Sequence, residues 1–147
     1  MNQHHIKSLI VLLGSLRALK WHYWNCHWMS KGENSYGDHL LFERLYSEKI
    51  DEQIDVLAEK IIALSKDPYV LDSDIMLIGF NRFVEKYKQT DFVLRSLDME
   101  KQMQTLIENV YTNLKKNNVL SLGMDDYLMA TANERETVVY LLTQRSR

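Results

Sequence analysis

Apolar positions recur along most of the chain at the three- and four-residue spacing of an α-helix. From residue 3 to about 30 this spacing predicts one long amphipathic helix. Gly32 and Asn34 should follow its end, because both residue types tolerate the left-handed cap conformation. A second long helix is predicted from about 38 to 64, and it should stop before Pro68, which cannot continue the helical hydrogen-bond ladder.

The second half of the chain continues the helical pattern after an interruption. Between about 69 and 95 the pattern is broken, and Asp72 or Ser73 could cap only a short helix there. A third long helix is predicted from about Leu97, and Asp125 is expected to cap a fourth. Two short joints and one long middle connection are typical of ferritin-like folds. The pattern therefore predicts an all-α, ferritin-like four-helix bundle with a long crossover connection that carries a short helix.

Composition adds little beyond a single globular domain. The 147 residues suit one domain spanning 1–147, with 46% hydrophobic and 26% charged residues. A net charge of −2 provides no bulk field for nucleic acid. The longest apolar run, Leu9 to Leu13, is too short to span a bilayer, and no signal-peptide pattern precedes it. The single cysteine, Cys26, suits a reducing compartment, so we expect a cytoplasmic protein.

Five side chains in the first 60 residues suggest metal chemistry. His27 and His39 lie twelve residues apart, Glu43 lies one helical turn after His39, and Asp55 and Glu59 form a second same-face pair. Imidazole and carboxylate are donor types that an Fe(II)-like ion accepts. His39 and Asp55 are separated by about 24 Å along an ideal helix and about 160° around it, so no single ion can touch both pairs. Either the pairs are unrelated, or a twofold partner brings its acids to the histidines of this chain.

Each of these residues also has an ordinary structural interpretation. His27 could be a polar residue at a helix end, and His39 with Glu43 could be a plain helical side-chain pair. Asp55 and Glu59 could belong to a solvated helix face. The remaining histidines, His4, His5 and His22, are not expected to bind metal. The chain lacks the Glu-x-x-His repeats of an intra-bundle di-iron site and the His-Glu-x-x-His of a zinc peptidase, which excludes an ordinary ferritin.

The stretch from Leu19 to Ile62 resembles the Dps family, the mini-ferritins (DNA-binding proteins from starved cells). The family-like elements are His27-Trp28, Gly32, Asn34, His39, Phe42-Glu43, Leu45-Tyr46 and Asp55-x-x-Ala58-Glu59-Lys60-Ile61. A weaker match follows in Gly123-Met124-Asp125 and in Tyr140-Leu141-Leu142. About a third of the chain carries the likeness firmly.

The resemblance implies a hollow dodecamer built from dimers, with ferroxidase centres at the dimer interfaces. One subunit would supply His27, His39 and Glu43, and its partner would supply Asp55 and Glu59. Family members oxidise iron as Fe(II), preferably with hydrogen peroxide or otherwise with oxygen, and store the ferric mineral inside the shell. We also retain two alternatives: a non-catalytic Dps-like shell or interaction protein with a degraded metal site, and a small helical metalloprotein of another enzymatic class.

Three further expectations concern surfaces around this shell. Trp28 occupies the family's tryptophan beside the centre and either intercepts oxidising equivalents or serves as an aromatic interface residue. Arg145 and Arg147 are only two charges at the carboxyl end, so DNA binding is expected to be weak or absent. Asp125 and Asp126 fall where such shells place acidic iron-entry pores, although Asp125 fits a helix cap equally well.

The chain departs from the family pattern at one point. The interval from His39 to Asp55 is one residue longer than the family's usual interval, so one extra residue lies between Tyr46 and Asp55. A single inserted residue in a helix is commonly absorbed as a π-bulge. The sequence therefore predicts a bulge or kink in this segment. Asp51 and Glu52 would be substitute ligands if the register slipped.

Overall fold

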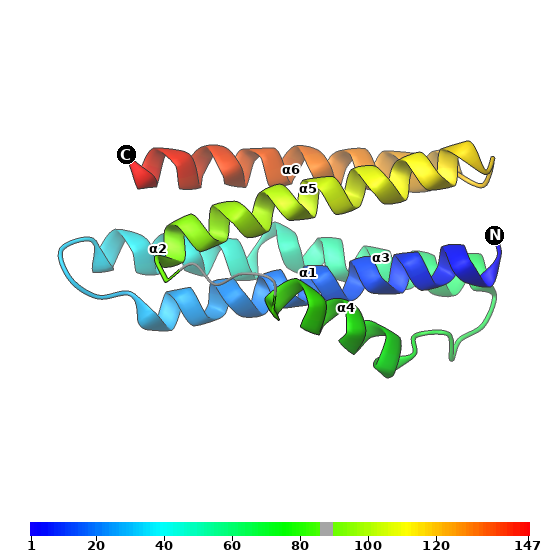
Figure 1. The fold of residues 1–147 in the computed structure, drawn as a ribbon, viewed down its shortest axis with the longest axis horizontal. Helices are drawn as coiled ribbons and strands as arrows, with labels where there is room; N and C mark the ends of the chain where they lie inside the picture. Colours follow the sequence, from blue (N-terminus) through cyan, green and yellow to red (C-terminus); the bar gives the residue numbers. More distant parts are fainter. Residues whose placement is uncertain (86–89) are drawn as a thin grey trace.

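Helices make up the architecture of the computed structural model, which describes residues 1–85 and 90–147 (Figure 1). The helices are α1 (Gln3–Met29), α2 (Ser35–Ser47), α3 (Lys49–Ser65), α4 (Ser73–Glu85), α5 (Phe92–Lys116) and α6 (Leu122–Ser146). The described residues contain no β-strand. The predicted all-α class is confirmed.

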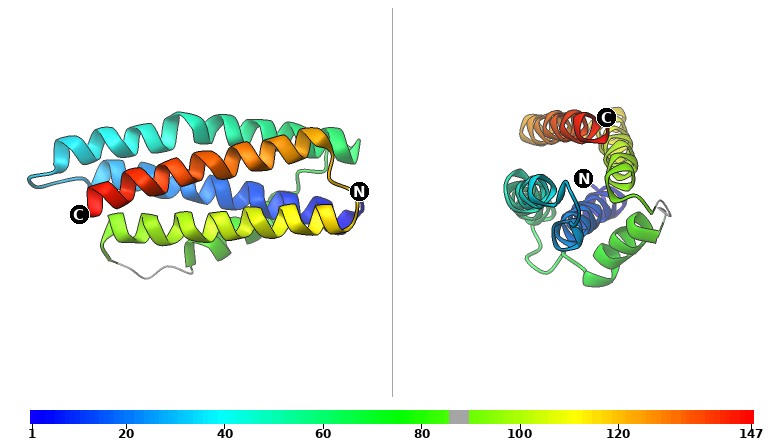
Figure 2. Two further views of the ribbon diagram at one scale, coloured as in Figure 1. Left: turned by 90° about the horizontal axis from the view of Figure 1, so that it is seen from above. Right: turned by 90° about the vertical axis from the view of Figure 1, so that its left-hand side faces the viewer.

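The long helices form two antiparallel pairs that lie against each other. α1 pairs with the segment made of α2 and α3, and α5 pairs with α6 (Figures 1 and 2). The end of α3 and the start of α5 lie at opposite ends of the bundle, so the chain must cross its length between them. The short helix α4 lies in this crossover and packs mainly on α1. The predicted four-helix bundle with a helix-bearing crossover is therefore confirmed.

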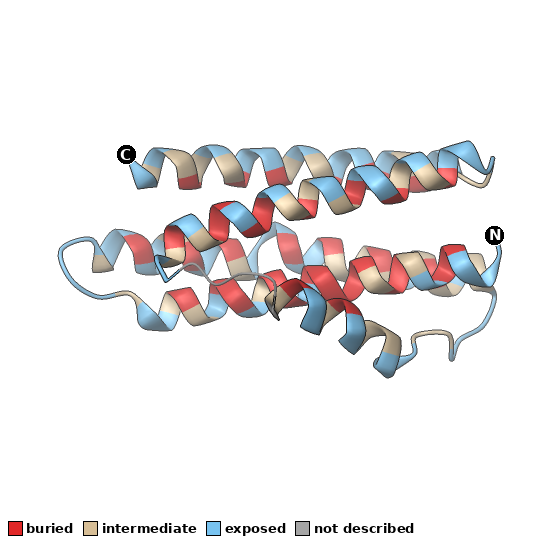
Figure 3. Ribbon diagram, in the orientation of Figure 1, coloured by how far each residue is buried: buried red, intermediate tan, exposed pale blue. Residues whose placement is uncertain are grey.

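Buried residues line the helix faces that point into the bundle (Figure 3). They are mostly leucine, isoleucine, valine and methionine, with Tyr23 and Phe42 as the largest fully buried aromatic residues. Burying each of these side chains contributes roughly 1.5–3 kcal/mol relative to exposing it, so this core is the main stabilising feature of the fold.

The helix ends differ in detail from those expected. α5 begins at Phe92 rather than near Leu97, because the Asp91 carboxylate accepts hydrogen bonds from the amides of Val93 and Leu94. α6 begins at Leu122, because the Ser121 hydroxyl accepts a hydrogen bond from the amide of Met124 at 3.1 Å. The expectation that Asp125 caps this helix is wrong, since Asp125 lies in its first turn. Both helices begin about one turn before the predicted residue, because Asp91 and Ser121 accept hydrogen bonds from the first free backbone N–H groups of the helix.

Two glycines let α4 lie almost backbone to backbone against α1. A Cβ atom added at Gly14 would stand 2.1 Å from the carbonyl oxygen of Met76, and one at Gly79 would stand 2.5 Å from that of Val11. Neither position can hold a larger residue without moving a backbone. This contact holds α4 on the outer side of α1.

The second long helix is interrupted at the segment where an extra residue was predicted. α2 ends at Ser47 and α3 begins at Lys49, while Glu48 between them has φ −90° and ψ −104°. This ψ lies far from the helical value near −42°, so the interruption is a break rather than a π-bulge. The predicted kink is therefore confirmed, with Glu48 at its centre.

Candidate metal centre

The imidazoles of His27 and His39 lie face to face across the turn between α1 and α2. Their ring centroids are 3.7 Å apart with an interplanar angle of 26°. His27 Nδ1 is 2.9 Å from the carbonyl oxygen of His39, and His39 Nδ1 is 3.1 Å from that of His27. The turn is possible because Gly32 adopts φ +85°, a conformation that glycine reaches at no steric cost.

This reciprocal arrangement determines which nitrogen of each ring carries the proton. A carbonyl oxygen can only accept, so each Nδ1 donates its hydrogen, and in a neutral ring the lone pair is then on Nε2. Metal-binding histidines commonly donate one ring N–H to a carbonyl in this way, which leaves the other nitrogen for the ion. The arrangement thus leaves the Nε2 atom of each ring as the one that could bind a metal ion.

The three candidate carboxylates lie on the surface of the same chain. Glu43 lies one turn after His39 on α2, and Asp55 and Glu59 are exposed on α3. Within the described part of the chain, no three His, Cys, Asp or Glu side chains lie together as a metal site. A single subunit therefore brings the two histidines together but leaves the acids apart, and the sharing of one ion between two subunits stays a prediction.

The two proposed substitute ligands lie on different sides of α3. Asp51 forms an ion pair with the ammonium of Lys20 on α1. The same ammonium lies 5.7 Å from the ring centroid of Trp24. Glu52 instead lines a groove between α3 and α6. Asp51 is therefore already neutralised by a neighbour, and Glu52 faces another helix.

A chain of aromatic rings leads away from His27, and the sequence did not place Tyr46 or Trp24 at the site. Tyr46 meets the His27 ring edge-on at 5.2 Å, and Trp24 stacks on Tyr46 at 5.1 Å with an angle of 13°. Trp28 lies 5.3 Å from Trp24. Tyr46 is seven residues after His39, two helical turns along the same face, and this spacing could have placed it at the site.

Large apolar side chains are exposed on both α1 and α4. Trp21, Trp24 and Trp28 are 47%, 36% and 56% exposed. Leu77 and Ile78 of α4 are each 45% exposed. A cleft of about 440 Å³ lies in this region, lined by Arg17, Lys20, Trp21, Trp24, Asp51, Ile54 and Phe80. Large apolar residues gathered on a surface commonly mark a protein–protein contact.

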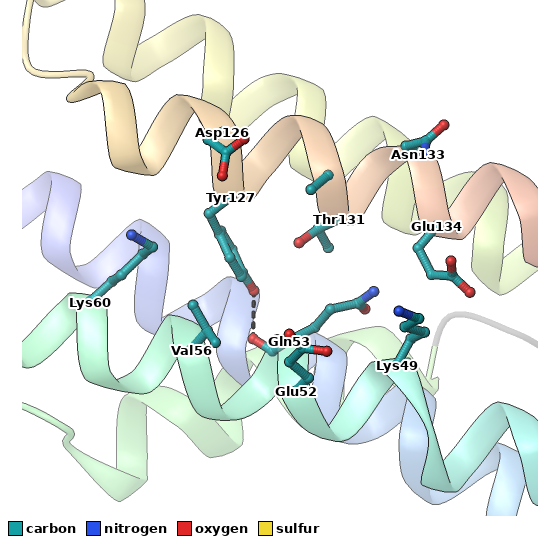
Figure 4. Close-up of a pocket in the computed structure, with 11 residues that line it drawn as sticks. Lys49, Glu52, Gln53, Val56, Lys60, Asp126, Tyr127, Thr131, Asn133 and Glu134 are labelled. Carbon is teal, nitrogen blue, oxygen red and sulfur yellow. Dashed lines mark hydrogen bonds between the residues drawn. The ribbon is translucent and has the colours of Figure 1, made fainter.

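A second groove, of about 480 Å³, runs between α3 and α6 (Figure 4). The hydroxyl of Tyr127 crosses it and donates to the backbone carbonyl of Gln53 at 2.6 Å. Its charged lining residues are Lys49, Lys60, Glu52, Asp126 and Glu134. Asp126 thus faces this groove, and the groove carries both signs of charge rather than an acidic surface.

An ion pair occupies the centre of the bundle. Arg135 Nη1 of α6 donates to Glu100 Oε1 of α5 at 2.9 Å, and the two side chains are 1% and 0% exposed. Burial raises the pKa of Glu100 to about 7, and the Arg135 charge opposes this rise. The sequence analysis did not predict this pair. The spacing from Glu100 to Met103 and from Met103 to Ile107 is three and four residues, which places Glu100 on the buried face of α5.

His22 belongs to this interior and not to the candidate centre. The Ser96 hydroxyl donates to the Phe92 carbonyl, so His22 Nε2, 2.7 Å from Ser96 Oγ, must be the donor in their hydrogen bond. Burial, together with the charge of Arg95, lowers the pKa of His22 to about 4. Burial likewise raises the pKa of Cys26 to about 12, which keeps it a thiol. His22 is therefore a neutral core residue.

Comparison with known proteins identifies the fold. A scan against protein-family models and a search of curated proteins found no match. Among solved structures, the X-ray structure of Dps from Thermosynechococcus elongatus aligns with a TM-score of 0.83 and 18% sequence identity, over 99% of this chain and 91% of that one. At this identity the likeness concerns the fold. Among the described helices, none is long and apolar enough to cross a membrane.

Proposed function

Because the chain has a Dps-like, ferritin-like fold, we propose that it is a cytoplasmic iron-storage and detoxification protein that oxidises Fe(II) with hydrogen peroxide or oxygen. The observation that carries this proposal is the reciprocal hydrogen bonding of the stacked His27 and His39 rings, which uses both Nδ1 atoms and leaves the Nε2 atoms for an ion. Neutral imidazoles bind Fe(II), and carboxylates then favour the more highly charged Fe(III). Iron is here the substrate and the stored cargo.

The proposed centre is shared between two subunits. One chain supplies His27, His39 and Glu43, and its partner supplies Asp55 and Glu59. The exposed acids and the incomplete site of the single chain agree with this division. The exposed tryptophans Trp24 and Trp28 of α1 lie close to the histidines and offer apolar area that a second copy would bury.

The assembly is proposed to be a dodecamer built from such dimers. The support is the likeness of the whole chain to the Dps fold. Light scattering tests it directly, because a dodecamer has about twelve times the 17.4 kDa mass of the chain. A monomeric mass would contradict both the shell and the shared centre.

The chemistry balances when two Fe(II) ions react with one peroxide. Each ion gives one electron, the O–O bond breaks, and two protons are taken up to form two water molecules and two Fe(III). This pairing avoids the hydroxyl radical that a single electron would release. Trp28, close to Trp24 and exposed near the histidines, is proposed to intercept the oxidising equivalents that escape.

The decisive experiment separates the two halves of the centre. A variant with His27→Ala and His39→Ala, and another with Asp55→Ala and Glu59→Ala, should each lose rapid Fe(II) oxidation by peroxide, measured as Fe(III) absorbance in stopped flow. His4→Ala, at an exposed histidine, serves as the control and should behave as wild type.

Co-refolding the two inactive variants tests the sharing itself. Half of the dimers formed at random contain one chain of each kind, and each of these has one intact centre, so about a quarter of the centres should be restored. If each centre lay within one chain, mixing would restore nothing. Double-histidine variants that oxidise iron at the wild-type rate would contradict the assigned ligands.

DNA binding is proposed to be weak or absent. Arg145 is held by Asp38 through two hydrogen bonds of 2.5 and 2.9 Å, so its charge is largely neutralised. Gel-shift titration at low salt checks this expectation, and tight binding that survives added salt would contradict it.

A further inference from the structure

The buried faces of α2 and α3 do not follow one continuous helix. The buried residues are Asp38, Phe42 and Leu45 in α2, and Ile50, Gln53, Leu57 and Ile61 in α3. Within each segment they are separated by three or four residues, as one helix face requires. From Leu45 to Ile50 the step is five. The buried face therefore slips by one residue across the break.

Glu48 is positioned to be the residue that causes this slip. Its backbone N–H still bonds the carbonyl of Arg44 at 3.2 Å, so α2 ends in regular geometry, and the chain turns only at the ψ of Glu48. Its side chain is exposed and makes one surface ion pair with Arg44. We propose that Glu48 is an extra residue held out of the helix, and that it corrects the register between the histidine half and the acid half of the candidate centre.

The geometry shows what this correction achieves. Take the centre of the buried face of each helix as zero degrees around the helix axis. Glu43 then lies roughly 130° from the buried face of α2, and Asp55 lies roughly 155° from the buried face of α3 in the same direction of rotation. If the helix were unbroken, Asp55 would lie roughly 105° from the buried face in the opposite direction of rotation. That is the side on which Val56 now lines the groove toward α6. The break thus keeps Asp55 and Glu59 on the outer surface rather than against α6.

The same correction explains why Asp51 and Glu52 are not required as ligands. With the register restored, Asp51 faces α1 and its partner Lys20, and Glu52 lines the groove toward α6. The acid pair left on the outer surface is Asp55 and Glu59. This assignment rests on the proposed function, whereas the register correction rests only on the buried faces.

Deletion of Glu48 tests the register correction without reference to metal. The deletion joins α2 and α3 into one helix in which the buried residues follow three- and four-residue steps throughout, so the melting temperature should stay at or above that of wild type. Insertion of one alanine after Glu48 adds a second extra residue and should lower it. Deletion of the exposed Glu108, in the uninterrupted α5, is the matched control and should also lower it. If deletion of Glu48 destabilised the protein as much as deletion of Glu108, the proposal would be overturned.

Titration with Co(II), whose visible absorption reports its ligands, tests the consequence for the centre. The protein lacking Glu48 should bind Co(II) as wild type does, and the alanine insertion should weaken binding by about tenfold or more. Wild-type binding that disappears on deletion of Glu48 would overturn the positioning claim even if the fold is intact. If wild type itself binds no Co(II), the proposed function fails, and the melting temperatures still decide the register correction.

Discussion

Breaking the buried Glu100–Arg135 ion pair should cost different amounts of stability depending on which partner is removed. The pair joins α5 to α6 in the centre of the bundle, with both side chains essentially inaccessible to solvent. Glu100→Leu leaves a buried guanidinium that keeps its proton at every working pH. Removing one partner of such a pair costs about 3–5 kcal/mol, because an uncompensated charge remains buried.

Arg135→Met should lower the free energy of unfolding by less than Glu100→Leu does, because the unpaired Glu100 carboxylate can become neutral by binding a proton. From the ordinary pKa of 4.5, protonating Glu100 at pH 7 costs about 3 kcal/mol, which sets the upper limit of this electrostatic loss. At pH 5 the same protonation costs less than about 1 kcal/mol, so the loss should shrink. Burial already raises the pKa of Glu100 to about 7, so little free energy is needed to protonate it near neutral pH.

Urea unfolding followed by circular dichroism, at one protein concentration and at pH 7 and pH 5, measures both losses. The double variant with Glu100→Leu and Arg135→Met should unfold close to wild type, since replacing both partners by apolar residues of similar size is often neutral or stabilising. An Arg135→Met loss that exceeds the Glu100→Leu loss, or one that is equal at the two pH values, would refute the reasoning.

Three other perturbations follow from single contacts. Gly79→Ala forces a Cβ against the α1 backbone and should cost about 1–3 kcal/mol in thermal unfolding, whereas Gly37→Ala, with open space around it, should cost none of this; equal losses would contradict the close crossing. Wild type should lose stability relative to His22→Asn, by up to about 3 kcal/mol, as the pH drops from 6.5 to 4. In this range His22 of the unfolded chain binds a proton, whereas buried His22, with its pKa lowered to about 4, does not. A stability difference that is independent of pH would refute this. Asp91→Ala should cost about 1 kcal/mol by removing the cap of α5, and Asp91→Asn should restore most of it in urea unfolding.

Periodic spacing proved sufficient for the fold but not for the ends of its helices. The three- and four-residue steps of Ile6, Leu9, Leu13 and Leu16 predict a helix because amphipathicity is repeated at every turn. The start of α6 depended on a choice between Ser121 and Asp125, two good capping residues one turn apart, and the pattern alone could not distinguish them. The extra residue before Asp55 could be located only to a segment, and the break at Glu48 became definite when the buried residues on each side were known.

The sequence by itself determined the all-α class, the crossover and the histidine and acid pairs, because these depend on spacing along one helix or across one short turn. Only the tertiary structure decided that the imidazoles of His27 and His39 face each other and that each Nδ1 bonds the backbone carbonyl of the other residue. It also decided the Glu100–Arg135 pair and the one-residue slip of the buried face at Glu48. Residues 35 positions apart, such as Glu100 and Arg135, meet because of how two helices pack, and packing depends on the shapes of all neighbouring side chains at once. A local pattern records which face is buried, but not what that face will meet.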